Sequence, residues 1–245
     1  MNLKEMETSW IISSKNLRRV EKAMLDSLLE RFASIVVLDV ETTGIDPVRD
    51  EIIELAAVQI EKSKDIVDEF DLLVALSPNR RLPPIITQLT GISEDALRDE
   101  GVPKAVACKR FADMLSNPNT LAIAYNAQFD LCFLYYLLDG FGRDDVLRNA
   151  KFLDALTVYK DRQPYPHKLS DAIYVYGLQA QNTHRAIDDT KATVELMCAM
   201  EGEQKDLFRY VNLFGYNPKY GISGQKISSV KYVQQPYNAV KKLYE

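Results

Sequence analysis

Residues 35–44 read IVVLDVETTG, a β-branched apolar run that ends in two acids and a turn. Apolar residues on both faces predict a strand that is covered on both sides. Side chains two residues apart in a strand point the same way, about 6–7 Å apart, so Asp39 and Glu41 should project together. A single Asp-x-Glu pair is common by chance and often marks only an exposed strand end. The meaning of this pair therefore depends on the rest of the chain.

The sequence around this strand predicts an α/β fold. Residues 51–76 have the pattern of two strands joined by a polar stretch, and residues 120–125 and 151–159 predict a fourth strand and a fifth that passes into a helix. Helical patterns are found in the following ranges: 16–32, short segments after Ser93 and Pro103, 127–140, 168–177 and 185–200. A loop with Pro83 and Pro84 leads to TQLTGIS at residues 87–93. Strands followed by alternating strands and helices predict one mixed-sheet domain over about residues 34–200.

The composition is that of an ordinary globular protein, with 47% hydrophobic and 27% charged residues among 245. The longest apolar runs are too short to cross a bilayer, and the first residues lack the apolar core of a secretory signal. The three cysteines are far apart in the sequence, which favours reduced residues in a cytoplasmic protein over disulfides or a zinc site. A net charge of −5 argues against a protein that coats nucleic acid by charge alone.

A third acid, Asp130, stands in the otherwise apolar stretch from Phe129 to Leu138. A helix of this composition should be buried nearly all round, where an ionised carboxylate is costly without a cationic partner. The alternative is a first-turn aspartate favoured by the helix dipole, with Asn126 as the cap.

The stretch HRAIDD at residues 184–189 offers two more acids, which helical geometry separates. At about 100° per residue, Asp189 shares an arc with apolar residues, whereas Asp188 lies on the solvent face. His184 directly precedes this helix, where its side chain would reach the same place as Asp189. We assign the other histidine, His167, a structural role.

Four inward-facing carboxylates therefore come from separate segments: Asp39, Glu41, Asp130 and Asp189. Acids that converge without cations would repel one another and lose solvation. Oxygen ligands suit Mg²⁺ or Mn²⁺, and two such ions about 3.5–4 Å apart promote phosphodiester cleavage. Histidine titrates near neutral pH, so His184 is a candidate base for the attacking water.

The order and spacing of these motifs resemble the DEDDh family of 3′–5′ exonucleases, which have a ribonuclease H-like fold. DVETTG is similar to the first motif, YNAQFD to the second and HRAIDD to the third, and TQLTGIS is similar to the segment between the first two. The resemblance covers about residues 34–200. It implies a mixed five-stranded sheet flanked by helices, with His184 and the four acids as catalytic residues around two Mg²⁺ or Mn²⁺ ions.

The resemblance also implies contacts with the substrate, a single-stranded or frayed 3′ end. The residues implied are Thr42, Gly44, Leu89, Asn126 and Phe129. Gly44 would let the backbone approach the ligand closely. The expected product is a nucleoside 5′-monophosphate released from DNA, with RNA as the alternative substrate. Proofreading, repair trimming and RNA turnover all fit the sequence.

Two segments lie outside the resemblance: a helical extension at residues 1–33 and a basic aromatic one at residues 201–245. The second carries eight Phe and Tyr between residues 205 and 245. This mixture suits either a stacking platform for single strands or a tail that packs its rings on the domain, and we favour the second. Either extension is a candidate docking segment for a polymerase or another protein.

Two rival functions use the same sequence features. One is another metal-dependent phosphotransfer enzyme of this fold, such as an endonuclease. The other is a non-catalytic module that binds nucleic acid or a polymerase.

Overall fold

The computed structural model describes residues 25–63, 66–117, 119–237 and 241–245. Within them a five-stranded sheet has the order β3–β2–β1–β4–β5. The strands are β1 (Ser34–Thr42), β2 (Ile52–Glu61), β3 (Ile66–Leu73), β4 (Thr120–Ala124) and β5 (Lys151–Asp154). The pairs β1–β2 and β2–β3 are antiparallel, and the pairs β1–β4 and β4–β5 are parallel. This arrangement confirms the predicted mixed sheet of the ribonuclease H-like fold.

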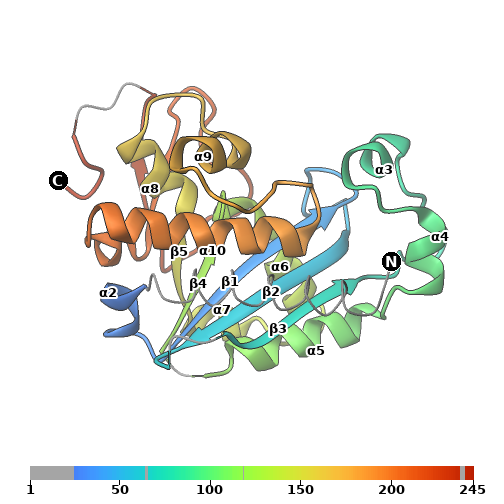
Figure 1. Ribbon diagram of the computed structural model, residues 1–245. Coiled ribbons are helices and arrows are strands. Elements are labelled where there is room, and N and C mark those ends of the chain that lie inside the picture. The colour runs from blue at the N-terminus through green and yellow to red at the C-terminus, as the bar shows by residue number, and fades with distance from the viewer. Residues whose placement is uncertain (1–24, 64–65, 118, 238–240) are drawn as a thin grey trace, which may run out of the picture.

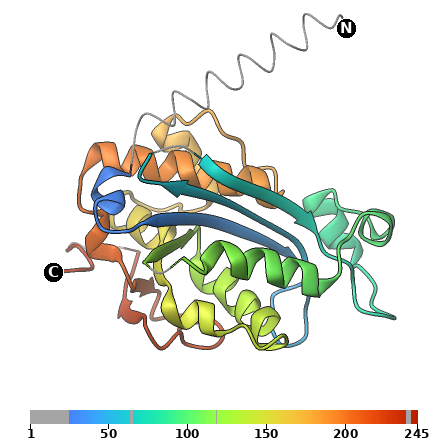
Figure 2. The same cartoon turned by 90° about the horizontal axis from the view of Figure 1, so that it is seen from below.

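Helices cover both faces of the sheet (Figures 1 and 2). One face packs against α2 (Asp26–Leu29), α8 (Ala155–Arg162), α9 (Leu169–Tyr176) and α10 (Ala186–Glu203). The other packs against α5 (Lys104–Leu115), α6 (Ala127–Asp139) and α7 (Asp145–Asn149). Ile35 and Val37 of β1 lie in the first core, whereas Val36, Leu38 and Val40 lie in the second. The alternation explains why β1 is apolar on both faces.

Most of the predicted helix boundaries are present. Ser93 caps α4 (Glu94–Asp99), since its Oγ accepts a hydrogen bond from the Ala96 N–H. Pro103 precedes α5, and Gly177 ends α9 in the left-handed conformation. Among the described residues, no helix is long and apolar enough to cross a membrane.

The structure differs from the sequence prediction at three places. Where a loop with Pro83 and Pro84 was expected, a helix begins: α3 (Pro84–Thr90), which Pro84 begins with a suitable fixed φ and Gly91 ends with a φ of 72°. The short helix α7 was not predicted. Of the helix predicted at residues 16–32, residues 16–24 lie outside the described residues, and the described part forms the single turn α2.

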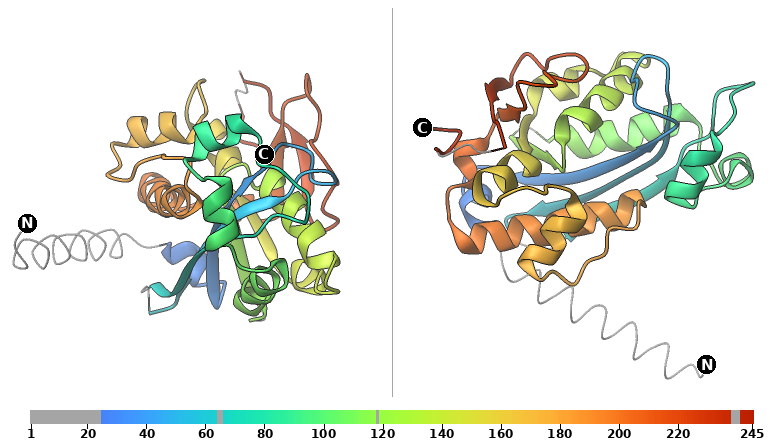
Figure 3. Two further views of the ribbon diagram at one scale, coloured as in Figure 1. Left: turned by 90° about the vertical axis from the view of Figure 1, so that its right-hand side faces the viewer. Right: turned by 90° about the horizontal axis from the view of Figure 1, so that it is seen from above.

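The C-terminal segment packs beside β5 (Figure 3). It contains the 3₁₀ helix η1 (Leu207–Tyr210) and a parallel pair, β6 (Leu213–Tyr216) with β7 (Lys231–Gln234). Asn212 joins it to the edge strand: its N–H donates to the Phe152 carbonyl at 2.7 Å, and its Oδ1 accepts from the Phe152 N–H at 2.8 Å. Tyr210 and Phe214 are buried in the two cores. These rings therefore favour the packing interpretation of the tail.

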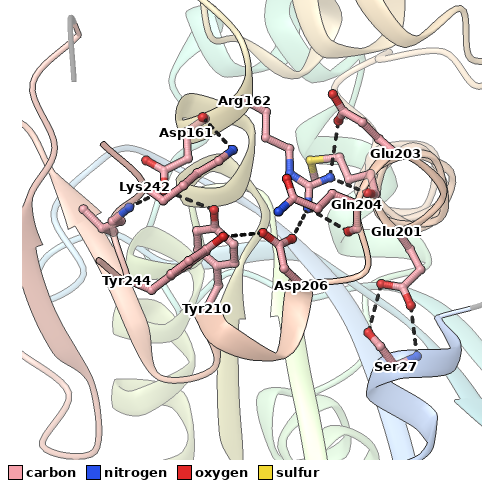
Figure 4. A network of polar contacts seen from close by, with 12 residues as sticks. Ser27, Asp161, Arg162, Glu201, Glu203, Gln204, Asp206, Tyr210, Lys242 and Tyr244 are labelled. Atoms are coloured by element: carbon pink, nitrogen blue, oxygen red, sulfur yellow. Dashed lines mark hydrogen bonds and ion pairs between the residues drawn. The ribbon is translucent and has the colours of Figure 1, made fainter. Parts of the chain in front are cut away.

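A buried ion pair ties the same segment to the ends of α8 and α10 (Figure 4). The Arg162 side chain is only 1% exposed and lies 2.5 Å from Asp206 and 3.3 Å from Glu203. The Tyr244 hydroxyl donates to Asp206 at 2.7 Å, and the Leu243 N–H donates to Asp161 at 2.6 Å. The final residues are thus fixed to the body of the domain.

Candidate active site

The end of β1 brings three of the predicted acids together. Asp39 and Glu41 lie on this strand, both half-buried. Asp130 comes from the first turn of α6 and is 2% exposed. Its Oδ1 accepts a hydrogen bond from the Val40 N–H at 3.1 Å, which places the carboxylate against the backbone of β1.

The start of α10 adds the fourth acid and the histidine. Asp189 is buried, and its carboxylate accepts from the Asn182 side chain at 2.6 Å and the Thr183 N–H at 3.2 Å. Asp188 instead accepts from the Thr183 hydroxyl on the outer side of the helix. One donor atom each of Glu41, His184 and Asp189 lies within 4.8 Å of the others. His184 is partly exposed, so solvent reaches this edge of the cluster.

Burial disfavours the charge of all four acids, and repulsion from neighbouring acids adds to this at Asp39 and Glu41. Burial raises the pKa of Asp39 well above its usual range, and Asp130, Glu41 and Asp189 raise it further. Burial, followed by Asp189 and Glu54, raises the pKa of Glu41 to about 8. Burial also raises the pKa values of Asp130 and Asp189.

No lysine or arginine among the described residues forms an ion pair with Asp39, Glu41, Asp130 or Asp189. The cluster therefore offers oxygen donors in excess of protein cations. This donor chemistry fits hard divalent ions such as Mg²⁺ or Mn²⁺.

The turn after β1 holds two of the predicted substrate-binding residues. The Thr42 hydroxyl donates to the Gly44 carbonyl at 2.5 Å and closes the turn. A Cβ at Gly44 would collide with an Asp50 carboxylate oxygen, so a larger residue here would require the Asp50 side chain to move. This is a structural reason for Gly44 that the sequence did not reveal.

The other three predicted substrate-binding residues lie on separate elements. Asn126 is exposed with a φ of 67°, and its side chain makes no capping hydrogen bond to α6. The capping alternative is thus wrong for its side chain. Phe129 is half-buried against Phe133, with ring centroids 4.9 Å apart. Leu89 is 48% exposed on α3, at the same end of the sheet as the end of β1 (Figures 1 and 3).

Sequence reasoning missed Glu54 and Arg185. Glu54 lies on β2 directly opposite Glu41 and is fully buried. Its Oε1 accepts from Arg185 Nε at 2.8 Å and from Nη2 at 2.5 Å, and its Oε2 accepts from the Ala186 N–H at 2.8 Å. Arg185 also lies 3.9 Å from Asp71, whose pKa is raised to about 6 chiefly by burial and by Glu54. The available signal was an acid within the apolar run IIELAAV.

Sequence reasoning also missed Asp154, which has a structural role at the site. Its buried carboxylate accepts from the Asn126 and Ala127 N–H groups and from the start of α8. It thereby fixes the turn that begins α6. His167 contacts the Gln163 carbonyl and packs on Tyr159, outside the carboxylate cluster.

Comparison with known proteins identifies the family. The family model described as RNase T exonuclease matches residues 36–197. The PolC-type DNA polymerase III of Bacillus subtilis is 36% identical over 170 residues, which cover 67% of this chain and 11% of that protein. The corresponding protein of Clostridium perfringens is 34% identical over 194 residues, or 76% of this chain and 12% of that protein. The chain thus spans little more than a tenth of these relatives.

Solved structures show the same fold at lower identity. Exonuclease I of E. coli, in a zinc-bound complex with single-stranded DNA, superposes with a TM-score of 0.64 at 20% identity, covering 73% of this chain and 42% of that one. Another structure of exonuclease I gives 0.64 at 22% identity, with 73% and 43% covered. With its family match over two thirds of its length and its three motifs in order, the chain belongs to the RNase T exonuclease family, in the DEDDh group.

Proposed function

We propose that this protein is a 3′–5′ exonuclease that hydrolyses the last phosphodiester bond of a nucleic acid and releases a nucleoside 5′-monophosphate. The observation that carries the proposal is the cluster of four carboxylates, none of which forms an ion pair with a lysine or arginine of the described residues, with His184 beside Glu41 and Asp189. Family membership supports the reaction class.

In this proposal Asp39, Glu41, Asp130 and Asp189 hold two Mg²⁺ or Mn²⁺ ions. When bound, such ions stabilise the charge that develops on the attacking and leaving oxygens. The acids could not keep their negative charge together without this compensation, because burial and mutual repulsion raise their pKa values.

His184 acts as the general base. A water oxygen forms a bond to the phosphorus, its proton passes to the imidazole, and the bond from phosphorus to the 3′ oxygen of the preceding nucleotide breaks. The 3′ oxygen takes a proton from solvent and becomes the new terminal hydroxyl. The exposure of His184 gives the imidazole a route for passing its proton to solvent afterwards.

The terminal nucleotide is bound by the turn after β1 and by the start of α6. Thr42 and Gly44 provide the turn, Asn126 an exposed amide, and Phe129 and Leu89 apolar surface for the bases. The substrate we propose is a single-stranded or frayed 3′ end of DNA, with RNA as the alternative. The DNA polymerases and the single-stranded DNA complex among its relatives support this choice.

The proposal extends to partners and location. The terminal segments provide surface for a polymerase or another protein. All three cysteines are free and buried, which suits a reducing compartment such as the cytoplasm.

The test uses oligonucleotides of DNA and RNA with matched sequences, labelled at the 5′ end, and with Mg²⁺, Mn²⁺ or EDTA. A 3′–5′ exonuclease gives a ladder that shortens one nucleotide at a time and disappears in EDTA. Short internal fragments from a substrate with both ends blocked would instead indicate an endonuclease. Binding of Mn²⁺ and DNA without cleavage of any substrate would indicate the non-catalytic module. Asp39→Asn serves as the inactive control.

A further inference from the structure

We propose that Glu54 and Arg185 form a clamp that positions His184, and that Glu54 is not one of the metal-binding acids. The inference rests on the proposed function, because it assigns positioning residues to the same site. Glu54 lies outside the motifs by which the family resemblance was recognised, and Arg185 is a residue of HRAIDD to which the resemblance gave no role.

The hydrogen bonds of Glu54 show that its carboxylate is already fully engaged. It is 0% exposed, and both oxygens accept short hydrogen bonds from the segment that follows His184. Arg185 binds one oxygen through two nitrogens, and the Ala186 N–H at the start of α10 binds the other. Charge-assisted contacts of this kind are among the strongest hydrogen bonds in proteins.

The position of Glu54 explains why the arginine is needed. Residues directly opposite in an antiparallel pair have neighbouring side chains on one face, and like charges there destabilise the sheet. Glu54 lies opposite Glu41 and would be a fifth uncompensated acid. Arg185 provides the compensation for Glu54 and leaves the four remaining acids free for cations.

The backbone of His184 explains what the clamp positions. His184 has a φ of 56°, a left-handed conformation that is unfavourable for a residue with a side chain and persists only where neighbours enforce it. On one side, the Thr183 N–H and hydroxyl are bound by Asp189 and Asp188. On the other side, Arg185 and Ala186 are bound by Glu54. The imidazole is therefore directed toward Glu41 and Asp189 by restraints on both of its neighbours.

The test compares Arg185→Met with Arg110→Met. Arg110 is a control for the arginine itself: it forms a two-nitrogen pair with Asp68 at 2.8 and 2.5 Å, and its side chain is 32% exposed against 41% for Arg185, whereas Asp68 is 39% exposed and Glu54 0%. Arg185→Met should lower kcat roughly 10- to 100-fold, the range for partners that orient site residues, with KM within about twofold of wild type. Arg110→Met should leave kcat unchanged. Arg185→Lys should give an intermediate kcat, because lysine keeps the positive charge but cannot bind Glu54 through two nitrogens.

A double variant separates positioning from stability. Arg185→Met should lower the Tm, because it leaves the buried Glu54 carboxylate without its cation. Adding Glu54→Gln removes that negative charge, so the Tm of the double variant should return toward the wild-type value while kcat stays low. A kcat that recovers together with the Tm would show a purely structural pair and overturn the proposal. A raised KM with normal kcat would make Arg185 a substrate-binding residue and would also overturn it.

Two measurements on protein without substrate complete the test. The chain has two histidines, and Arg185→Met should shift the imidazole NMR resonances of His184 but not those of His167. Mn²⁺ titration by calorimetry should give Glu54→Gln the wild-type stoichiometry, and loss of an ion would make Glu54 a ligand and overturn the proposal. Because these readouts need no turnover, a wild-type protein that cleaves nothing would refute the proposed function while leaving the clamp measurable.

Discussion

Replacing Arg162 by methionine should destabilise the whole domain, because it leaves Asp206 charged and buried without its cation. The Arg162 side chain is 1% exposed and the Asp206 side chain 8%, at a separation of 2.5 Å. Arg162 also donates to the Met200 and Gln204 carbonyls at the end of α10, whose last turn has no basic residue of its own. Removing one partner of a buried pair costs about 3–5 kcal/mol. Methionine keeps most of the apolar stem, so the loss reports charge and hydrogen bonds.

The assay is urea unfolding followed by far-UV circular dichroism, which gives the free energy of unfolding and its slope with urea. The control is Arg98→Met, since Arg98 pairs with Asp95 and Asp99 but its side chain is 64% exposed. Exposed pairs contribute roughly 0–1 kcal/mol. If Arg162→Met loses no more stability than Arg98→Met, the Arg162–Asp206 pair does not hold the C-terminal segment in place. The reasoning from its burial would then be refuted.

Three further predictions concern the site. Asp189→Asn should lower kcat by more than the roughly 100-fold effect of an outer partner, while Asp188→Asn changes it little; equal losses would refute the distinction between the two acids. His184→Ala should lower kcat roughly 10²- to 10⁴-fold and abolish the acidic limb of the pH–rate profile, with Mn²⁺ binding retained in calorimetry; an unchanged limb would exclude the histidine as base. In EDTA the free energy of unfolding should fall as pH rises from 4.5 to about 8, because the raised pKa of Glu41 means that the folded state holds a proton that the unfolded state has lost. Urea unfolding at several pH values tests this, and Glu41→Gln should weaken the pH dependence.

The acids of the cluster were predictable because each carries a local signal. Asp39 and Glu41 share a strand face, Asp130 interrupts an apolar helix, and Asp189 occupies the inward arc of α10. Short-range periodicity determines which way each side chain points. Their convergence is a tertiary property, and it was inferred from the need to compensate several buried acids and from the order of the family motifs.

The clamp was not predictable by the same reasoning, because Glu54 and Arg185 are 131 positions apart and neither follows a motif rule. Their contact depends on the β1–β2 register and on where α10 begins. The tail shows the same limitation. Its aromatic residues suit either stacking on bases or packing, and only the contacts of Tyr210 and Phe214 with the two cores distinguish these roles.

One irregularity in the sheet connects the carboxylate cluster to the helices beyond β2. Residues on one face of a regular strand are an even number of positions apart. Ile52 and Leu55 nevertheless share one core, although they are three positions apart. The register between β1 and β2 shifts after Glu41. Thr42 pairs with Ile52, and the intervening Ile53 has no partner residue on β1.

This bulge gives Ile53 a role that a regular strand could not provide. Ile53 is fully buried in a separate small core with Leu82, Ile92 and Leu97, which belong to the segments around α3 and α4. Bulges near active sites redirect side chains in this way. Because the bulge begins next to Glu41, the register that sets Glu41 opposite Glu54 also anchors α3, which carries Leu89. Ile53 and Glu54, two neighbouring residues of β2, therefore position both the proposed metal ligand Glu41 and the proposed base-contacting surface at Leu89 on α3.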